Sequence, residues 1–282
     1  MFALIAYLGW GIGDVFSTIV TRKLGAYSTT FWNLVFGLLI FSPYIPFVLN
    51  DLQNITPGIF LLNIALAAVL IVGIVAFYEG LRIANPSLVG TIAASFAAVT
   101  VVLSIIFLKE RITAPQTVAM LVVFSGLIVS TTDFNGLSAG KLAINRGIFL
   151  ALVAMMSWGV YFTFIKIPVR EIGWFWPAYI SSTPFPLVFL FMRRHKIKLT
   201  RPNFKGALLP LVLGAFLVRV AELSFNFAID RGLTAVVAPI AGAYPTLFVV
   251  LAFLVFKDPI TKQQIAGIGV TLIGIVLLSI FS

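Results

Sequence analysis

The feature that most constrains the fold of this chain is a series of apolar runs, each about twenty residues long, that recur throughout the sequence. That length is what an α-helix needs to cross the hydrocarbon core of a bilayer, which is about 30 Å thick. The runs cover residues 2–21, 29–49, 58–81, 87–108, 113–131, 147–168, 174–192, 205–230, 233–256 and 261–281. They predict an all-α integral membrane protein with ten transmembrane helices.

Composition agrees with this prediction. Hydrophobic residues make up 61% of the chain and charged residues 10%, against roughly half and a quarter in soluble domains. The net charge of +10 comes from Lys and Arg in short connections, which we interpret as topology signals rather than as a nucleic-acid surface. The absence of Cys excludes disulfides and thiolate metal sites, and we expect no metal and no cofactor.

The chain repeats one phrase, LKERITAPQTVAMLVVFSG at residues 108–126 and FKDPITKQQIAGIGVTLIG at residues 256–274. A shift of 148 residues also aligns Trp10 with Trp158 and Phe77 with Phe225, without a gap. A constant register over this length indicates an internal repeat. We therefore expect one five-helix repeat at residues 1–134, a linker at 135–146 and a second repeat at 147–282.

An odd number of spans in each copy makes the second copy enter the bilayer from the opposite side. Inverted repeats are typical of secondary transporters, because two halves related by an in-plane axis can exchange conformations and open the centre to either side. The expected architecture is two inverted five-helix repeats around a central cavity.

Two such repeats, each closing with Lys, an acidic residue, Ile-Thr, Gln and Gly, resemble the drug/metabolite transporter superfamily and, more narrowly, its EamA-type exporters. The resemblance covers essentially the whole chain and does not identify the substrate. It implies export of a small metabolite by alternating access, with a central cavity lined mainly by helices 1, 3, 4, 6, 8 and 9 of the ten.

The closing phrase also has a purely structural interpretation. Lys109, Glu110 and Arg111 would lie at the membrane surface, while Thr113 and Thr261 would cap the helices that follow. The second copy has Asp258-Pro259 in place of Glu110-Arg111, which favours a turn and cap over transport chemistry.

Loop charges predict the orientation. The basic loops, which include the cluster RRHKIKLTRPNFK at residues 193–205, gather on the side opposite the termini. The positive-inside rule then places both termini outside the cytoplasm of a plasma (inner) membrane, and we expect a prokaryotic source. The cluster would set topology and could also bind anionic lipids.

Ionisable residues deep inside a span are expensive, so they call for a partner or a wet cavity. Asp14, Arg219 and Glu222 are the deep charges, and their counterparts in the other repeat are Phe162, Ile71 and Ile74. Because the counterparts are apolar, the shared fold does not need these charges.

The polar residues of the eighth run, Arg219, Glu222 and Asn226, recur on one helix face, and Tyr7, Trp10 and Asp14 form a similar stripe in the first run. Two interpretations stay open. The three charges form a buried network that pins two helices together, or Arg219 binds a substrate carboxylate while Asp14 or Glu222 receives an ammonium. Asp14 and Glu222 are also the candidates for proton coupling.

Aromatic side chains complete the candidate substrate site. Trp10, Trp158, Tyr161 and Tyr244 could provide walls for an amphipathic or cationic substrate. Pro184 and Pro186 in the seventh run and Pro239 and Pro245 in the ninth are expected to bend their helices, and they are the gating candidates.

The best functional prediction is export of a small polar or amphipathic metabolite, with an amino acid first because the site offers both charge signs. Alternatives are nucleotide sugars, organic phosphates and cationic drugs. Several deep basic residues would favour a phosphate substrate. Only Arg219 lies deep, because Lys166 is expected to extend to the head groups. An intramembrane enzyme lacks the expected nucleophile-base pair or metal ligands. A channel is a further alternative, although inverted repeats and one asymmetric charged site suit a carrier better. The expected partners are a small molecule, the lipid bilayer and, for a homodimer, a second copy of the chain; a monomer is the alternative.

Overall fold

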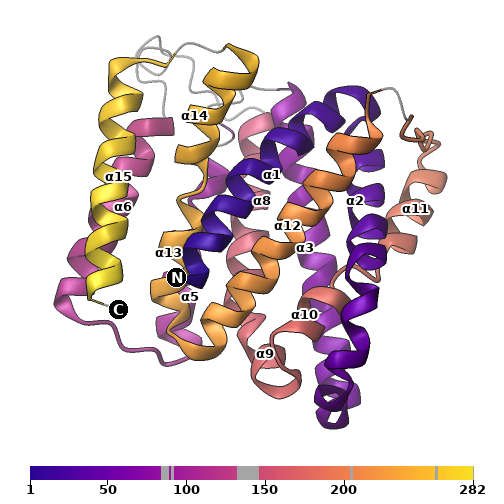
Figure 1. Cartoon of the computed structure of the whole chain (residues 1–282), viewed down its shortest axis with the longest axis horizontal. Coiled ribbons are helices and arrows are strands. Elements are labelled where there is room, and N and C mark those ends of the chain that lie inside the picture. The colour runs from indigo at the N-terminus through magenta and orange to yellow at the C-terminus, as the bar shows by residue number, and fades with distance from the viewer. Residues whose placement is uncertain (84–88, 90–91, 132–145, 204–205, 258–259, 282) are drawn as a thin grey trace. The chain divides into compact units, whose positions relative to one another are not determined.

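The computed structural model describes residues 1–83, 89, 92–131, 146–203, 206–257 and 260–281, and within these ranges the chain forms helices and no strands (Figure 1). The all-α prediction is therefore confirmed. The longer helices are α1 (Phe2–Leu24), α2 (Ala26–Phe41), α3 (Pro57–Ile83), α5 (Phe96–Phe107), α6 (Ala114–Thr131), α8 (Arg146–Phe164), α12 (Leu208–Arg231), α14 (Pro245–Phe256) and α15 (Lys262–Ile280). The shorter elements are η1 (Ser42–Phe47), η2 (Leu49–Asn54), α9 (Lys166–Ile172), α10 (Phe175–Ile180), α11 (Phe185–Arg194) and α13 (Thr234–Gly242).

The described helices match the membrane prediction in length and composition. Eight helical spans are long and apolar enough to cross a membrane, and Ile92–Phe107 and Ala114–Ser130 are shorter apolar helices. Large apolar side chains such as Leu61, Leu121 and Ile280 are about two-thirds exposed, which suits a surface facing lipid rather than water. The chain is a multi-pass membrane protein, and the count of ten spans stays a prediction.

The chain divides into two compact units, each built from residues of both sequence halves. The first unit contains Met1–Ile71 and Phe164–Arg231, and the second contains Val72–Thr163 and Gly232–Ser282. The helices α3 and α8 each pass from one unit into the other. Of the predicted linker at 135–146, only Arg146 lies within the described residues, where it begins α8. The division into halves at 1–134 and 147–282 stays a prediction.

In the first unit, α1 and α12 lie side by side and antiparallel (Figure 1). A Cβ on Gly9 would lie 2.9 Å from the Cβ of Ala221, and one on Gly13 would lie 2.9 Å from Cγ2 of Val218. From the other side, Gly214 meets Phe16. Glycines in these positions allow the two helix backbones to approach closely, which van der Waals packing rewards in a membrane.

In the second unit, α6 and α15 form a similar antiparallel pair (Figure 1). Gly126 lies against Thr271, and Gly274 lies against Val123. A shift of 148 residues carries Gly126 onto Gly274 and Val123 onto Thr271. The two contacts are therefore images of each other under exchange of the repeats, and the antiparallel packing supports the inverted orientation predicted from the odd number of spans.

The repeated phrase forms the same local structure twice. Lys109 and its counterpart Lys257 both have left-handed backbone, with φ of 56° and 62°. In the second copy, Gln264 N–H donates to Thr261 Oγ1 at 3.2 Å, and Thr261 N–H donates to Gln264 Oε1 at 2.8 Å. Thr113 and Gln116 exchange the same two bonds in the first copy. This is a capping box, so the turn-and-cap prediction is confirmed.

The two predicted spans that contain the gating prolines are broken rather than bent. The seventh run divides into α10 and α11, with Pro184 capping the start of α11 and Pro186 in its first turn. The ninth run divides into α13 and α14, with Pro245 at the start of α14 and Pro239 inside α13. A proline lacks the backbone donor of the helix interior and is tolerated in the first turn, so helices begin there. The gating role of these prolines stays a prediction.

Candidate functional site

The polar face of α12 lies inside the first unit. Arg219 and Glu222 are 5% and 6% exposed, and Asn226 is 2% exposed. The offsets of three and seven residues place them along one side of the helix, as the sequence predicts. Asp230, further along the same face, is exposed and pairs with Arg231 at 3.2 Å.

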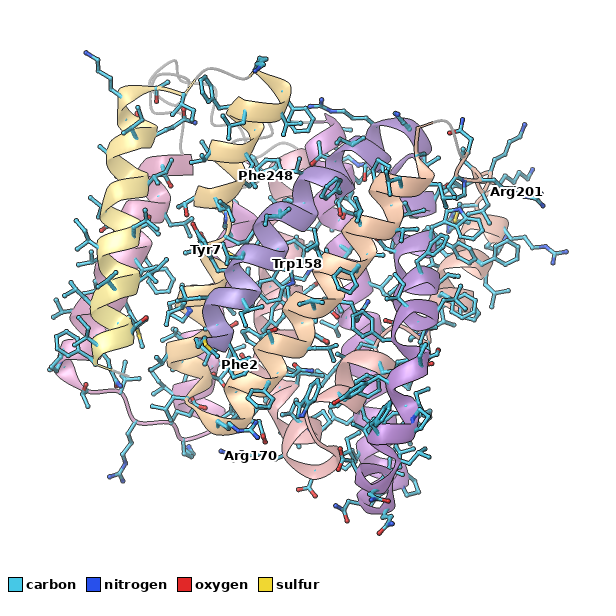
Figure 2. All side chains as sticks on the ribbon, in the orientation of Figure 1. Phe2, Tyr7, Trp158, Arg170, Arg201 and Phe248 are labelled. Carbon is cyan, nitrogen blue, oxygen red and sulfur yellow. The ribbon has the colours of Figure 1, made fainter. Side chains whose placement is uncertain are left out.

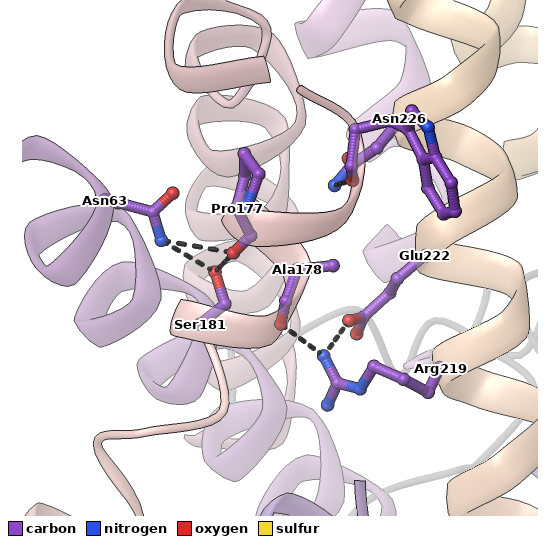
Figure 3. Close-up of polar contacts among 8 residues, drawn as sticks. Asn63, Pro177, Ala178, Ser181, Arg219, Glu222 and Asn226 are labelled. Carbon is purple, nitrogen blue, oxygen red and sulfur yellow. Dashed lines mark hydrogen bonds and ion pairs between the residues drawn. The ribbon is translucent and has the colours of Figure 1, made fainter. Parts of the chain in front are cut away.

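Arg219 makes two contacts through the same nitrogen. Its Nη1 donates to the Glu222 carboxylate one turn along α12, and it also donates to the backbone carbonyl of Ala178 in α10 at 3.0 Å (Figure 3). Its Nε is buried and has no hydrogen-bond partner among the described residues. A buried donor without a partner has lost its hydrogen bond to water, which costs free energy. A ligand oxygen that accepts from Nε would restore a hydrogen bond at this edge of the guanidinium.

The same edge of the guanidinium, which carries Nε and Nη2, lies beside α2 at Gly37. A Cβ at this position would lie 3.1 Å from Nε and 3.2 Å from Nη2 of Arg219. Any side chain larger than hydrogen would therefore displace the charged group. Gly37 provides the space in which Arg219 is held.

Two amides donate to the same short helix that Arg219 contacts. Asn226 Nδ2 donates to the carbonyl of Trp174 at 3.1 Å, and Asn63 Nδ2, from α3, donates to the carbonyl of Pro177 at 3.1 Å (Figure 3). Trp174 immediately precedes α10, whose six residues are Phe175–Ile180, and the Pro177 carbonyl also accepts from the N–H of Ser181 at 3.0 Å. Side chains from α3 and α12 thus attach to this short helix and to the residue before it.

The stripe on α1 lies in the same unit. Tyr7 and Trp10 are buried, and the Trp10 ring lies 5.6 Å from that of Phe225, a residue of α12. Asp14 is half-buried, and its backbone carbonyl accepts from Thr18 Oγ1 at 2.7 Å.

The described hydrogen bonds of Arg219 are to Glu222 on its own helix and to the Ala178 carbonyl of α10. A three-charge network that includes Asp14 stays a prediction.

The remaining aromatic candidates belong to the second unit. Trp158 lies against Gly73, where a Cβ would lie 2.6 Å from its Cδ1 and Nε1, and its ring packs on those of Phe77 and Phe96. Tyr161 is 1% exposed, and Tyr244 is buried at the start of α14. Their part in a substrate site shared with Arg219 stays a prediction.

Two charged residues are placed differently from what the sequence suggested. Lys166, expected to extend to the head groups, is 2% exposed in the first unit. Glu110, expected at the membrane surface, is buried in the second, where its two carboxylate oxygens accept from the backbone N–H groups of Thr234 and Ala235 at 2.9 and 2.8 Å. Glu110 therefore caps α13. Its counterpart Asp258 lies outside the described residues.

Sequence reasoning missed Asn63 and Gly37, although both carry a signal. Asn63 is an amide in the apolar run LLNIALAAVLIVGIVAF, and its counterpart is Leu211. Gly37 has Phe185 as its counterpart, so the two repeats differ greatly in volume at that position. Asymmetry between repeats, applied to amides and glycines as well as to charges, would have identified both.

The buried polar side chains of the first unit, Arg219, Glu222, Asn226 and Asn63, can form hydrogen bonds and ion pairs in apolar surroundings. Within the part of the chain that the structure describes, no group of three or more His, Cys, Asp or Glu side chains could hold a metal ion. The guanidinium edge that carries Nε suits a carboxylate or phosphate oxygen, and Glu222 suits a cation.

Comparison with known proteins gives a family match. The EamA-like transporter family matches residues 1–132 and 145–280. An S-adenosylmethionine uptake transporter of Rickettsia conorii is 24% identical over 207 residues, which is 67% of this chain and 68% of that protein. A probable amino-acid metabolite efflux pump of Salmonella typhimurium is 29% identical over 134 residues, 46% of this chain and 42% of its own length.

A solved crystal structure has the same fold. It aligns with a TM-score of 0.79 over 99% of this chain and 95% of that one, at 16% sequence identity. The helical arrangement is thus found in an experimental structure whose sequence is very different.

Proposed function

Because the chain belongs to the EamA-like transporter family, and is therefore a membrane transporter, we propose that it exports an amino acid or an amino-acid derivative by alternating access. The observation that carries the choice of substrate is the buried Arg219–Glu222 pair, whose guanidinium keeps Nε without a partner in the described structure. A zwitterionic substrate offers a carboxylate to Arg219 and an ammonium to Glu222.

The names of two relatives agree with this substrate class. One is called an S-adenosylmethionine uptake transporter and the other a probable amino-acid metabolite efflux pump. S-adenosylmethionine contains an α-amino-acid group, and the second name refers to amino-acid metabolites. The names differ in direction, and our proposal of export follows the family resemblance.

The contacts of α10 suggest how binding is linked to movement. Arg219 Nη1 is bonded to the Ala178 carbonyl as well as to Glu222. A substrate carboxylate that draws the guanidinium toward itself weakens the bond to α10. Because α10 lies between Gly173 and the break before Pro184, it can shift as a short segment without bending a long helix.

Charge balance gives Glu222 a further role in this mechanism. When the zwitterion leaves, Glu222 loses the positive charge of the substrate ammonium. A proton on Glu222 then replaces that charge, so that substrate and proton alternate at the site and transport is linked to the proton gradient. Asp14 is the second candidate for this role. If transport is insensitive to an imposed pH gradient, the coupling is wrong and the carrier works by facilitated diffusion.

The experiment that tests the substrate class is a thermal-shift screen of the purified protein against amino acids, sugar phosphates and organic cations, followed by counterflow of the labelled hit in proteoliposomes. Arg219→Lys keeps the charge but loses the planar fork, and it should raise the half-saturating concentration at least about tenfold. Arg170→Lys, at an exposed position in the same unit, is the matched control and should leave it unchanged.

The pair Arg219→Gln with Glu222→Gln guards against misfolding, because it leaves neither charge buried alone. An amino-acid hit whose affinity survives both Arg219→Lys and this double change would contradict the carboxylate clamp. Saturable counterflow distinguishes a carrier from a channel, and a chemically altered product would reveal an enzyme.

An organic phosphate or a nucleotide sugar is the second candidate, favoured by the burial of Lys166. With Arg219 it gives the first unit two buried cations, whereas the sequence indicated one, and phosphate oxygens prefer more than one positive partner. A sugar phosphate hit in the screen, weakened by Lys166→Gln as well as by Arg219→Lys, would favour this candidate over an amino acid.

A further inference from the structure

A dense group of positive charges lies in the turn that follows α11. The side chains of Arg193, Arg194, Lys196, Lys198 and Arg201 are all exposed, and we call residues 193–201 the basic turn. Figure 2 shows Arg201 there, at one end of the first unit, and Arg170 at another. None of the five takes part in the proposed transport site.

Among the described residues, no acidic side chain is paired with the basic turn. Residues 193–203 contain no Asp or Glu, and none of the described ion pairs involves a residue of the turn. The counterpart segment in the first repeat, residues 45–53, contains no Lys or Arg and one acid, Asp51. The fold that the two repeats share therefore does not require this charge.

The backbone of the basic turn is fixed to α2. Trp32 Nε1 donates to the carbonyl of Thr200 at 2.9 Å, and the N–H of Thr200 donates to Ser28 Oγ at 3.1 Å. The turn is closed at its start by a bond from Ile197 N–H to the Met192 carbonyl at 2.8 Å, next to a left-handed Lys196 with φ of 55°. The cations are therefore held on a fixed backbone.

A topology signal needs charge during insertion but no fixed backbone. The attachment to α2 is thus a feature that the topology role does not explain, whereas a binding surface gains from it, because less conformational freedom is lost on binding.

The position of the turn matches the level of lipid head groups. The residues of α11 just before it, including Leu187, Leu190 and Phe191, are large, apolar and exposed. The ring of Phe191 stacks on Tyr27 of α2 with centroids 5.6 Å apart, and aromatic rings concentrate at membrane–water interfaces. The charges begin where this apolar, aromatic surface ends.

We propose that the basic turn is a binding surface for anionic phospholipid head groups, such as phosphatidylglycerol. Guanidinium groups bind phosphate oxygens through two parallel N–H donors, and lysine ammonium groups add point charge. Polybasic segments next to a membrane are attracted to anionic lipids, and each cation strengthens the attraction about fivefold. This inference does not depend on the transported substrate.

Native mass spectrometry of the full chain in a neutral detergent, with added phosphatidylglycerol or phosphatidylcholine, tests the proposal. The unmodified protein should retain phosphatidylglycerol in preference to phosphatidylcholine. Arg193→Gln with Arg194→Gln should weaken phosphatidylglycerol binding about 25-fold, and raised salt should weaken it as well. The matched control, Arg111→Gln with Arg170→Gln, removes two exposed guanidinium groups elsewhere and should leave the preference intact.

A second variant, Lys196→Gln with Lys198→Gln, keeps the arginines and should show a similar loss, which covers the case in which the first variant inserts poorly. Inorganic phosphate at the same concentration as the lipid should not displace it. Equal losses in the basic-turn and control variants, displacement by inorganic phosphate, or no preference in the unmodified protein would each overturn the proposal.

Discussion

At Gly37 the missing side chain is what lets the Arg219 guanidinium lie against α2. A Cβ there would approach Nε to 3.1 Å, closer than an unstrained contact between carbon and nitrogen. The neighbouring Nη1 is held by Glu222 and Ala178, so the guanidinium cannot move away without loosening a bond. The geometry of the site therefore depends on a residue that has no functional group.

Gly37→Ala should consequently impair transport more than it impairs folding. We expect a destabilisation of about 1–2 kcal/mol from overpacking, partly offset by the better helix propensity of Ala, and at least a tenfold rise in the half-saturating concentration of substrate. Thermal unfolding and proteoliposome counterflow measure the two effects. Gly58→Ala is the control, because the nearest atom to its Cβ would be Thr56 Oγ1 at 3.9 Å; equal transport in both variants would disprove the role of Gly37.

Whether the sequence predicts a contact of this site depends on whether the hydrogen-bond partner is a nearby side chain or a distant backbone carbonyl. The pairing of Arg219 with Glu222 follows from their spacing of three residues on one helix, because such residues are neighbours. The contact with the Ala178 carbonyl, 41 residues away, has no sequence signal, because every residue has a backbone carbonyl. Only the break in the seventh run leaves the Ala178 carbonyl available. The acceptors of Asn63 and Asn226 are likewise backbone carbonyls, which no sequence pattern marks.

At the scale of the elements, the start of α13 depends on a residue that is distant in the sequence. Its first N–H groups would lack partners in a buried helix end, and Glu110, 124 residues earlier, accepts from two of them. A carboxylate also interacts favourably with the positive end of the helix dipole. The Lys-Glu part of the repeated phrase therefore serves a helix of the other repeat, beyond the turn in which it lies.

Glu110→Gln should destabilise the protein by about 2 kcal/mol, because the amide can accept one of the two bonds and places an N–H against the other donor. A fall of several degrees in the midpoint of thermal unfolding would report it. Glu171→Gln changes an exposed carboxylate and should have almost no effect. If the two variants unfold at the same temperature, Glu110 is not a cap that matters for stability.

The contrast between two caps explains which elements the sequence predicts well. Thr261 and Gln264 are three residues apart and form their capping box locally, so the pattern is readable from the phrase alone. The contact of Glu110 with α13 needs the tertiary fold. The breaks at Pro184 and Pro245 are intermediate, because proline marks a place where a helix can begin but does not show whether the chain bends or breaks there.

At the scale of the whole molecule, the packing of α6 on α15 links the repeat to the fold. Contacts that exchange Gly126 with Gly274 and Val123 with Thr271 are expected only if the two helices are equivalent and antiparallel. The sequence predicted the equivalence from the shift of 148 residues and the inversion from the odd number of spans. It could not predict that these two helices pack on each other, because nothing in a repeat specifies which copy its last helix contacts.

Two glycines on α15 test that packing directly. A Cβ on Gly267 would lie 2.7 Å from the Cα of Ser130, whereas one on Gly269 would have no atom within 4 Å. Gly267→Ala should lower stability by about 2 kcal/mol through forced separation of the helices. Gly269→Ala should be neutral or slightly stabilising because of helix propensity. Thermal unfolding in detergent compares the two, and a similar loss in both would contradict the close contact.

Charge within the first unit predicts the orientation of the protein in its membrane. The basic turn lies at one end of α2, and η1 and η2 lie at the other, beyond a helix of 16 residues that spans about 24 Å. The second end mixes Arg170 and Arg231 with Asp51, Glu171 and Asp230. The positive-inside rule counts Lys and Arg, so it places the basic turn in the cytoplasm and the end that bears η2 outside.

Because the chain contains no Cys, single cysteines report this orientation without background. Asn203→Cys, next to the basic turn, and Gln53→Cys, in η2, are both exposed positions and leave every charge in place. In intact cells a membrane-impermeant maleimide should label Gln53→Cys and spare Asn203→Cys, and both should react after the membrane is opened. The reverse pattern would show that the basic turn faces outward and would contradict the predicted orientation.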